Sequence, residues 1–147
     1  MADGARSMNF APNSWPVMDT SFENSCDDVV DTPAHLRVER EVIGANVGAN
    51  GYTTLDQADQ LGRLLNLRPN DRLLDVGAGR GWPGLYLAGQ SGCEATLLEI
   101  SDTDLRQAVG RAERTDVTAR CSFVRGTATA LPFRSKSFDA LIHADVL

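Results

Sequence analysis

The chain has 147 residues, of which 42% are hydrophobic, and its formal net charge is −6. This length accommodates one domain plus an extension. The acidic balance argues against a nucleic-acid partner, because clusters of Lys and Arg make most phosphate contacts, and no apolar run of about 18 residues indicates a membrane span.

Three cysteines, Cys26, Cys93 and Cys121, are scattered along the chain. An odd number of widely separated thiols is typical of reduced cysteines in the cytoplasm, and residues 1–10 lack the apolar core of a signal peptide. Neither a C-x-x-C pair nor a neighbouring histidine accompanies these thiols, so we expect a cytoplasmic protein and no metal site.

Residues 1–33 are an acidic segment, with six carboxylates and a single basic residue. Apolar residues there are sparse and aperiodic, which is typical of a mobile extension. The alternative is a lid that folds back through its aromatic and aliphatic residues, Phe10, Trp15, Val17, Met18 and Phe22. We divide the chain into this extension and the amino-terminal part of a folded domain at 34–147.

Two helices are predicted ahead of the first strand. The segment 33–47 has apolar residues roughly on one side of a helix, and glycines follow it. In the second helix, Thr54 and Gln57 have the spacing of a capping box, and leucines form a buried stripe that ends before Pro69.

The run LLDVGAGRGWPGLYLA, residues 73–88, carries most of the functional signal. An apolar strand over 72–76 contains Asp75, and a helix is predicted over 82–89. Three glycines lie between them at alternate positions: Gly77, Gly79 and Gly81. Glycine lets the backbone take φ > 0 and lie directly against a ligand, and a helix start offers unpaired N–H groups and a positive dipole end. The run therefore predicts a bound polar or anionic group.

The spacing of these glycines argues against a dinucleotide. That fingerprint, G-x-G-x-x-G, would place its third glycine at position 82, where this chain has Trp82. An indole at this place would obstruct the approach of a pyrophosphate.

The rest of the chain alternates between strands and a helix. Apolar residues predict strands over 95–100, 121–124 and 140–143, and Ser101 and Asp104 suggest the cap of an intervening helix. Strands that alternate with helices imply right-handed crossovers and a doubly wound parallel sheet.

The pattern D-x-G-x-G-x-G, which begins at Asp75, closely resembles the first motif of class I S-adenosylmethionine-dependent methyltransferases. The resemblance implies that Asp75 braces the glycine turn and interacts with the methionine end of the cofactor. It also implies that Gly77, Ala78 and Gly79 lie beneath the cofactor. The alternative is an ordinary turn whose glycines serve the backbone alone.

Glu99 lies 20 residues beyond Gly79, at the end of the second predicted strand. A carboxylate at this place accepts hydrogen bonds from both ribose hydroxyls in nucleoside-binding doubly wound folds, and Ile100 would lie against the adenine face. The alternative for Glu99 is a solvated acid at a strand end.

Residues 123–147 resemble the family's third and fourth strands. The family pattern reads Gly-Asp-Ala, Leu-Pro-Phe and Ser-Phe-Asp, and this chain departs from it at Thr127. Thr127 and Ala128 are candidates for adenine recognition, although a neutral hydroxyl is a weaker acceptor than a carboxylate. Tyr52, ahead of the second helix, and His143, at the end of the fourth strand, are further candidate cofactor contacts.

The resemblance covers about residues 50–147 and implies a Rossmann-like doubly wound parallel sheet with the strand order 3-2-1-4. The family's domain has seven strands, so we expect a truncated domain in which the cofactor-binding half is present. One edge of the fourth strand would then be unpaired, which favours self-association along that edge.

These observations predict S-adenosylmethionine-dependent methyl transfer to a small-molecule acceptor, with this chain supplying the cofactor half. His143 is the candidate catalytic base, and its alternative is a residue on the rim of the cofactor pocket without a chemical role. Two other functions stay open at this point: a degenerate or non-catalytic cofactor-binding module that acts through a partner, and a nicotinamide-dependent oxidoreductase.

Overall fold

The computed structural model describes residues 32–144. Its elements follow in the order α1 (Pro33–Ile43), α2 (Leu55–Leu65), β1 (Arg72–Val76), α3 (Gly84–Ser91), β2 (Glu94–Glu99), α4 (Asp102–Arg114), a 3₁₀ helix η1 (Thr118–Arg120), β3 (Cys121–Arg125) and β4 (Ala140–Ile142). The predictions of a mobile acidic extension and of a lid concern residues 1–33, of which 1–31 lie outside the described residues; Thr32 caps α1 and Pro33 is its first residue.

The four strands form one parallel sheet in the order β3-β2-β1-β4. β1 is central, because Leu74 pairs with Thr96 of β2 on one side and with Leu141 of β4 on the other. This order confirms the predicted Rossmann-like sheet, and every strand boundary agrees with the predicted one to within one residue. The carboxyl ends of all four strands meet at the same edge, where the glycine turn leaves β1.

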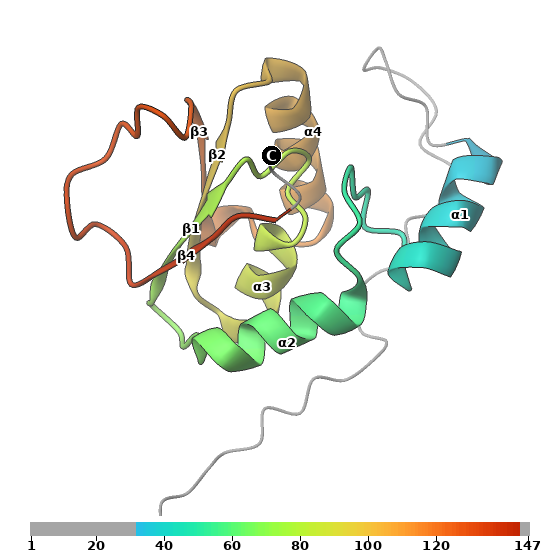
Figure 1. Cartoon of the computed structure of the whole chain (residues 1–147), viewed down its shortest axis with the longest axis horizontal. Helices are drawn as coiled ribbons and strands as arrows, with labels where there is room; N and C mark the ends of the chain where they lie inside the picture. The colour runs from blue at the N-terminus through green and yellow to red at the C-terminus, as the bar shows by residue number, and fades with distance from the viewer. Residues whose placement is uncertain (1–31, 145–147) are drawn as a thin grey trace, which may run out of the picture.

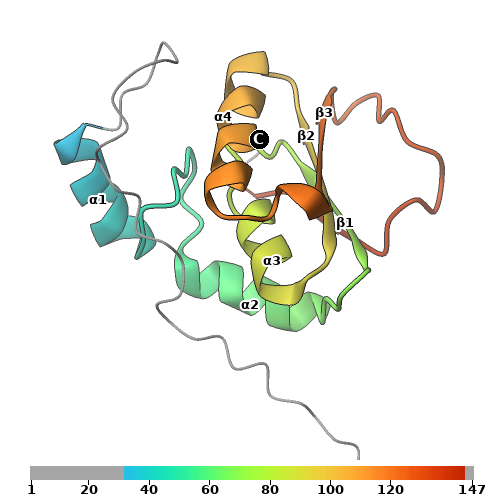
Figure 2. The same cartoon turned by 180° about the vertical axis from the view of Figure 1, so that it is seen from behind.

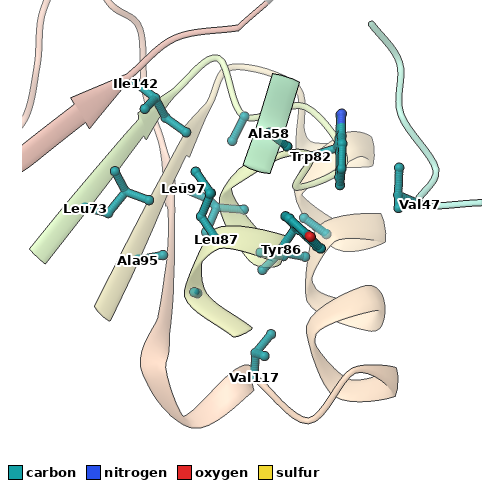
Figure 3. Packing of buried hydrophobic residues seen from close by; sticks show 14 of the residues in the cluster. Val47, Ala58, Leu73, Trp82, Tyr86, Leu87, Ala95, Leu97, Val117 and Ile142 are labelled. Carbon is teal, nitrogen blue, oxygen red and sulfur yellow. The ribbon is translucent and has the colours of Figure 1, made fainter. Parts of the chain in front are cut away.

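Helices α2, α3 and α4 cover one face of the sheet, and α1 stands farther out beyond α4 (Figures 1 and 2). Leu73 and Leu97 point from the strands into this helical layer, where Leu87 of α3 and Trp82 join the same core (Figure 3). These leucines are 0–1% exposed, and burying side chains of this size supplies roughly 1.5–3 kcal/mol each. The core therefore fixes β1, and with it the start of the glycine turn.

The other face of the sheet is covered differently. Because side chains alternate along a strand, Leu74, Val76 and Leu98 point away from the helices. They pack against Phe133 and Phe138 of the long segment between β3 and β4, whose rings meet edge to face at 4.9 Å. Among residues 32–144, no helix lies on this face (Figure 1).

The ends of the helices are set by individual capping residues, and two of them differ from the predicted bounds. The predicted helix over 33–47 is four residues too long, because α1 ends at Ile43 and Gly44 follows in the left-handed conformation, with φ 96°. The predicted capping box is confirmed: the Thr54 side chain accepts from the N–H of Gln57, whose side chain accepts from the N–H of Thr54. The helix predicted over 82–89 begins two residues later, at Gly84.

A single carboxylate sets the register of β4. Asp139 accepts from the backbone N–H of Arg72 at 2.9 Å and from its Nε at 3.1 Å, and the N–H of Asp139 donates to the carbonyl of Arg72 at 2.8 Å. The Arg72 guanidinium holds the pKa of Asp139 below its usual range. The Asp of the Ser-Phe-Asp motif therefore joins the first residue of β1 to the chain entering β4.

Candidate functional site

The glycine turn joins β1 to α3 at the carboxyl edge of the sheet. Gly77, Gly79 and Gly81 have positive φ values of 70°, 52° and 98°, in the region that favours glycine. The backbone N–H groups of Gly77 and Ala78 both donate to the carbonyl of Leu98 on β2, at 2.8 and 3.0 Å. The turn is thereby held against the end of β2, with no side chain at three alternate positions.

Asp75 lies beneath this turn and is only 1% exposed. Its Oδ2 accepts from the N–H of Gly84, the first residue of α3, at 3.0 Å. Burial raises the pKa of Asp75 to about 7, the hydrogen bond from Gly84 opposes this rise, and the nearby charge of Glu99 adds to it. The prediction that the start of α3 offers free N–H groups is therefore wrong for its first residue, because the N–H of Gly84 is already bound to Asp75. Pro83, which precedes it, has no backbone N–H.

Glu99, at the end of β2, joins the glycine turn to the start of α4. Its Oε2 accepts from the N–H of Gly79 at 2.9 Å, and its Oε1 accepts from the N–H groups of Ile100 and Ser101 at 2.7 and 3.0 Å. A carboxylate has roughly four lone-pair directions, so about one acceptor position remains for a ligand hydroxyl. Glu99 is thus a positioned carboxylate and not a freely solvated acid.

Thr127 lies beside the end of β2. The N–H of the preceding Gly126 donates to the carbonyl of Glu99 at 3.0 Å. The Thr127 hydroxyl accepts from the N–H of Thr129 at 3.3 Å and shares a hydrogen bond with the Thr129 hydroxyl at 3.0 Å. Ala128 is exposed between them. The hydroxyl is therefore oriented by its own loop, and the backbone of that loop is tied to the end of β2.

The remaining predicted residues lie at the surface. Ile100 is 65% exposed, so an apolar side chain is open to solvent directly beside Glu99. His143 is exposed one residue past β4, at the same sheet edge as the turn. Tyr52 is 82% exposed and belongs to the loop 44–54 between α1 and α2.

Two polar residues at the turn were missed in the sequence. The carboxamide of Asn50 lies on Gly79, since an ideal Cβ at that glycine would be 2.5 Å from both Nδ2 and Oδ1. Arg80 is 8% exposed, and its Nε is 3.7 Å from Oδ1 of Asp104. Its Nε and Nη1 donate no hydrogen bond within the described residues. The motif itself contains Arg80, whereas no sequence signal pairs Asn50 with a glycine so far along the chain.

Two hollows lie away from this edge. One is lined by residues at the amino ends of the strands, including Arg72, Glu94 and Ser122, and the other by Leu74 and Phe133 on the face without helices. None of the predicted cofactor residues lines either hollow. The described part of the chain holds no cluster of His, Cys, Asp and Glu suited to a metal ion. Within the same part, no helix has the length and apolar character needed to cross a membrane.

Sequence comparison assigns the second half of the chain to a known family. A family model described as a methyltransferase domain matches residues 73–147. The chain is 37% identical over 93 residues to 27-O-demethylrifamycin SV methyltransferase of Amycolatopsis mediterranei (strain S699). It is 35% identical over 86 residues to squalene methyltransferase 1 of Botryococcus braunii. These matches cover 60% and 58% of this chain but 34% and 23% of the relatives, so the chain spans about a third or less of their lengths.

Structural comparison points to the same family. A SAM-dependent methyltransferase from Thiobacillus denitrificans, solved in complex with S-adenosyl-L-homocysteine, matches with a TM-score of 0.59 and 25% sequence identity. The match covers 73% of this chain and 42% of that protein. The sheet and the helices of its helical face are thus arranged as in a cofactor-bound relative.

Proposed function

The chain belongs to the family of S-adenosylmethionine-dependent methyltransferases, and on this premise we propose that it holds this cofactor at the carboxyl edge of its sheet for the methylation of a small molecule. The observation that carries the proposal is the hydrogen bond between Glu99 and the backbone of Gly79, which joins a fixed carboxylate to a turn with glycine at three alternate positions. The degenerate module and the oxidoreductase are not favoured, because the relatives named above are all called methyltransferases.

In this proposal the turn carries the cofactor. Gly77, Ala78 and Gly79 lie beneath it, and the absence of a Cβ at the two glycines lets a ligand approach the backbone. Asp75 braces the turn from below by holding the start of α3 through Gly84. Its complete burial supports a bracing role more strongly than a direct contact with the methionine end.

The nucleoside end would lie along the ends of β2 and β3. Glu99 would accept a ribose hydroxyl with its remaining lone pair, and Ile100 would cover one face of the adenine. Thr127 and Ala128 would lie beside the adenine edge. The residues present fit this group, because the open acceptor of Glu99, the exposed side chain of Ile100 and the oriented hydroxyl of Thr127 all lie at the carboxyl ends of the neighbouring strands β2 and β3.

The chemistry assigned to the chain is modest. When bound, the cofactor supplies a methyl group on a sulfonium that is already a strong electrophile. The chain has to orient this group toward the acceptor and to exclude water. A general base is therefore not required where the acceptor atom is already nucleophilic. We accordingly place His143 and Tyr52 on the rim of the site, as residues that border the cofactor without taking a proton.

The small-molecule acceptor and the setting of the chain belong to the same proposal. Rifamycin and squalene appear in the names of the two relatives, and a net charge of −6 opposes binding to nucleic acid. The free thiols of Cys93 and Cys121 support a cytoplasmic location. We keep residues 1–33 as an extension, 34–147 as the domain portion, and the edge of β4 as a surface for self-association.

The proposal is tested by calorimetric titration of the purified chain with S-adenosylmethionine, with NADH as the competing cofactor. Gly79→Ala introduces a Cβ at a φ of 52°, 2.5 Å from the Asn50 side chain, and we expect it to weaken binding at least about tenfold, equivalent to 1.4 kcal/mol. Gly92→Ala is the matched control, since Gly92 also has a positive φ, of 74°, but its Cβ would have no neighbour closer than 3.6 Å. Binding of NADH alone, or equal losses in both variants, would contradict the proposal.

A further inference from the structure

The loop 44–54 is fastened to the domain by buried charged groups. Glu39 of α1 is 5% exposed, and its Oε1 accepts from the N–H groups of Val47 and Ala49 at 3.1 and 2.7 Å. Arg111 of α4 is 7% exposed, and its Nη1 donates to the carbonyl of Val47. A buried charge is costly unless hydrogen bonds compensate it. Because two buried charged side chains, one from α1 and one from α4, bond to the backbone of this loop, they hold it in one conformation.

A third contact ties the same loop to the glycine turn. The indole Nε1 of Trp82 donates to the carbonyl of Thr53 at 2.8 Å. The loop therefore lies between α1 and α4 (Figures 1 and 2) and reaches the turn from the helical side of the sheet. Trp82 stands where a dinucleotide-binding motif would have its third glycine. In the structure, its indole anchors the loop 44–54.

The fixed loop presents one carboxamide to the turn. Asn50 lies between the two anchored stretches, and its Nδ2, Oδ1 and Cγ would all be within 2.5–2.8 Å of a Cβ at Gly79. The residue is nevertheless exposed. A side chain that touches the turn on one side and solvent on the other borders any ligand that the turn holds.

The charge around this position favours an anionic group. Arg80 directly follows Gly79, is 8% exposed, and its Nε and Nη1 atoms donate no hydrogen bond within the described residues. Of the acidic groups at the site, Glu99 is bound to the backbone at the strand end, and Asp75 is enclosed below the turn. Asp104 lies 3.7 Å from Nε of Arg80 but accepts no hydrogen bond from it. A carboxylate above Gly79 would meet the amide donor of Asn50. The next residue, Arg80, is a cation whose Nε and Nη1 atoms lack hydrogen-bond acceptors among the described residues.

We propose that Asn50 is a cofactor-binding residue, whose carboxamide donates to the α-carboxylate of S-adenosylmethionine above Gly79. This inference rests on the proposed function and deepens it by assigning the amino-acid end of the cofactor. The nucleoside end lies at β2 and β3, and the amino-acid end extends toward the loop 44–54.

The test compares two ligands that differ only at the amino-acid end. S-adenosyl-L-homocysteine carries the carboxylate, whereas 5′-methylthioadenosine keeps the adenosine and the thioether without it. We expect Asn50→Ala to weaken the binding of S-adenosylhomocysteine at least about tenfold, equivalent to 1.4 kcal/mol. The affinity for methylthioadenosine should change less than about twofold. We expect Asn50→Asp to weaken S-adenosylhomocysteine further, because it sets a second negative charge beside the carboxylate.

The matched control is Gln60→Ala, which removes an exposed carboxamide on α2, and circular dichroism with a thermal melt checks that each variant folds. Equal affinities of wild type and Asn50→Ala for S-adenosylhomocysteine would overturn the inference and leave the proposed function standing. Equal losses for both ligands would also overturn it, since the contact would not then involve the amino-acid end. If the wild-type chain bound neither ligand, the proposed function would itself fail.

Discussion

Asp75 carries the largest electrostatic constraint at the turn. The residue is 1% exposed, and a single hydrogen bond, from the backbone N–H of Gly84, partly offsets the cost of burying its charge. Burial therefore favours the protonated form and raises the pKa to about 7. An unfolded chain would have the ordinary Asp pKa of about 3.9, so the native state binds this proton more tightly than the unfolded state does.

We predict from this difference that stability falls as the pH rises. Below about pH 4 both states are protonated, and between about pH 4 and pH 7 the unfolded state loses its proton first, which lowers the free energy of unfolding. A pKa difference of about 3 corresponds to about 4 kcal/mol at most. Asp75→Asn keeps an acceptor for Gly84 without the titration, so its stability, measured by urea unfolding from pH 4 to pH 8, should lack this decline. The control is Asp116→Asn at an exposed residue; parallel profiles for wild type and Asp75→Asn would contradict the prediction.

Thr127 is where the chain departs from the family pattern, and its hydroxyl is oriented by Thr129. We predict that Thr127→Asp tightens S-adenosylhomocysteine binding about fivefold, because a charged acceptor contributes about 1 kcal/mol more than a neutral one. The measurement is calorimetric titration at pH 7.5. Thr118→Asp adds the same charge in η1, at the opposite edge of the sheet, and should leave the affinity unchanged; tighter binding in both variants would show a general effect of charge.

The loop 44–54 is the element whose position depends most on distant residues. Gly48 has a φ of 66°, and a Cβ there would overlap the guanidinium of Arg111, which packs on it from α4. Gly44, which ends α1, has a φ of 96°, but a Cβ there would be at an ordinary 3.6 Å from Leu55. The two glycines thus share a backbone requirement and differ in the space around them.

We predict that Gly48→Ala destabilises the chain by about 1–3 kcal/mol more than Gly44→Ala, because it forces Arg111 out of a packed site. Gly48→Ala should also weaken the binding of S-adenosylhomocysteine, since the displaced loop carries Asn50. Urea unfolding and titration of both variants provide the measurement. Equal losses of stability would mean that the backbone conformation alone matters at Gly48.

Local signals in the sequence were sufficient for most elements. The strands follow from short apolar runs, and α2 from its Thr54–Gln57 capping box. The end of α1 and the start of α3 were placed wrongly for separate reasons. The predicted helix 33–47 includes Gly44, which instead ends α1 in the left-handed conformation. The contact at the start of α3 involves Asp75, nine residues before Gly84 and on a strand.

In the candidate site, residues within or next to the glycine motif were predictable, whereas contacts between distant parts of the chain were not. The position of Asp75, the glycines and Glu99 at one edge follows from spacing, because one strand–turn–helix unit and the next strand place them there, whereas their roles are implied by the family resemblance. The contacts of Asn50 with Gly79 and of Arg111 with Val47 join residues far apart in the chain. Pairings of this kind arise from how helices pack on the sheet, and a single sequence carries no local signal for them.

The sheet as a whole is built unevenly. Its helices lie on one face, and β4 pairs with β1 alone among the described strands. Leu141 of β4 is 50% exposed. An apolar strand edge with unpaired backbone groups is a template for pairing with another chain, which supports the proposed self-association along β4.

We predict that the purified chain self-associates with rising concentration and that Leu141→Lys reduces this association, because a lysine on an edge strand opposes pairing. Sedimentation velocity over a concentration series measures the effect. Val42→Lys is the matched control, since Val42 is 51% exposed on α1. A wild-type chain that stays monomeric throughout the series would contradict the prediction.

The most direct measurement is a ¹H–¹⁵N NMR titration of the labelled chain with S-adenosyl-L-homocysteine. If the cofactor binds at the carboxyl edge of the sheet, the amide signals of Gly77, Gly79 and Ile100 should shift in a saturable manner. The amides of Glu94 and Ser122, beside the hollow at the amino ends of the strands, should stay in place. Shifts confined to that hollow, or no shifts in a folded chain, would contradict a cofactor site at the glycine turn.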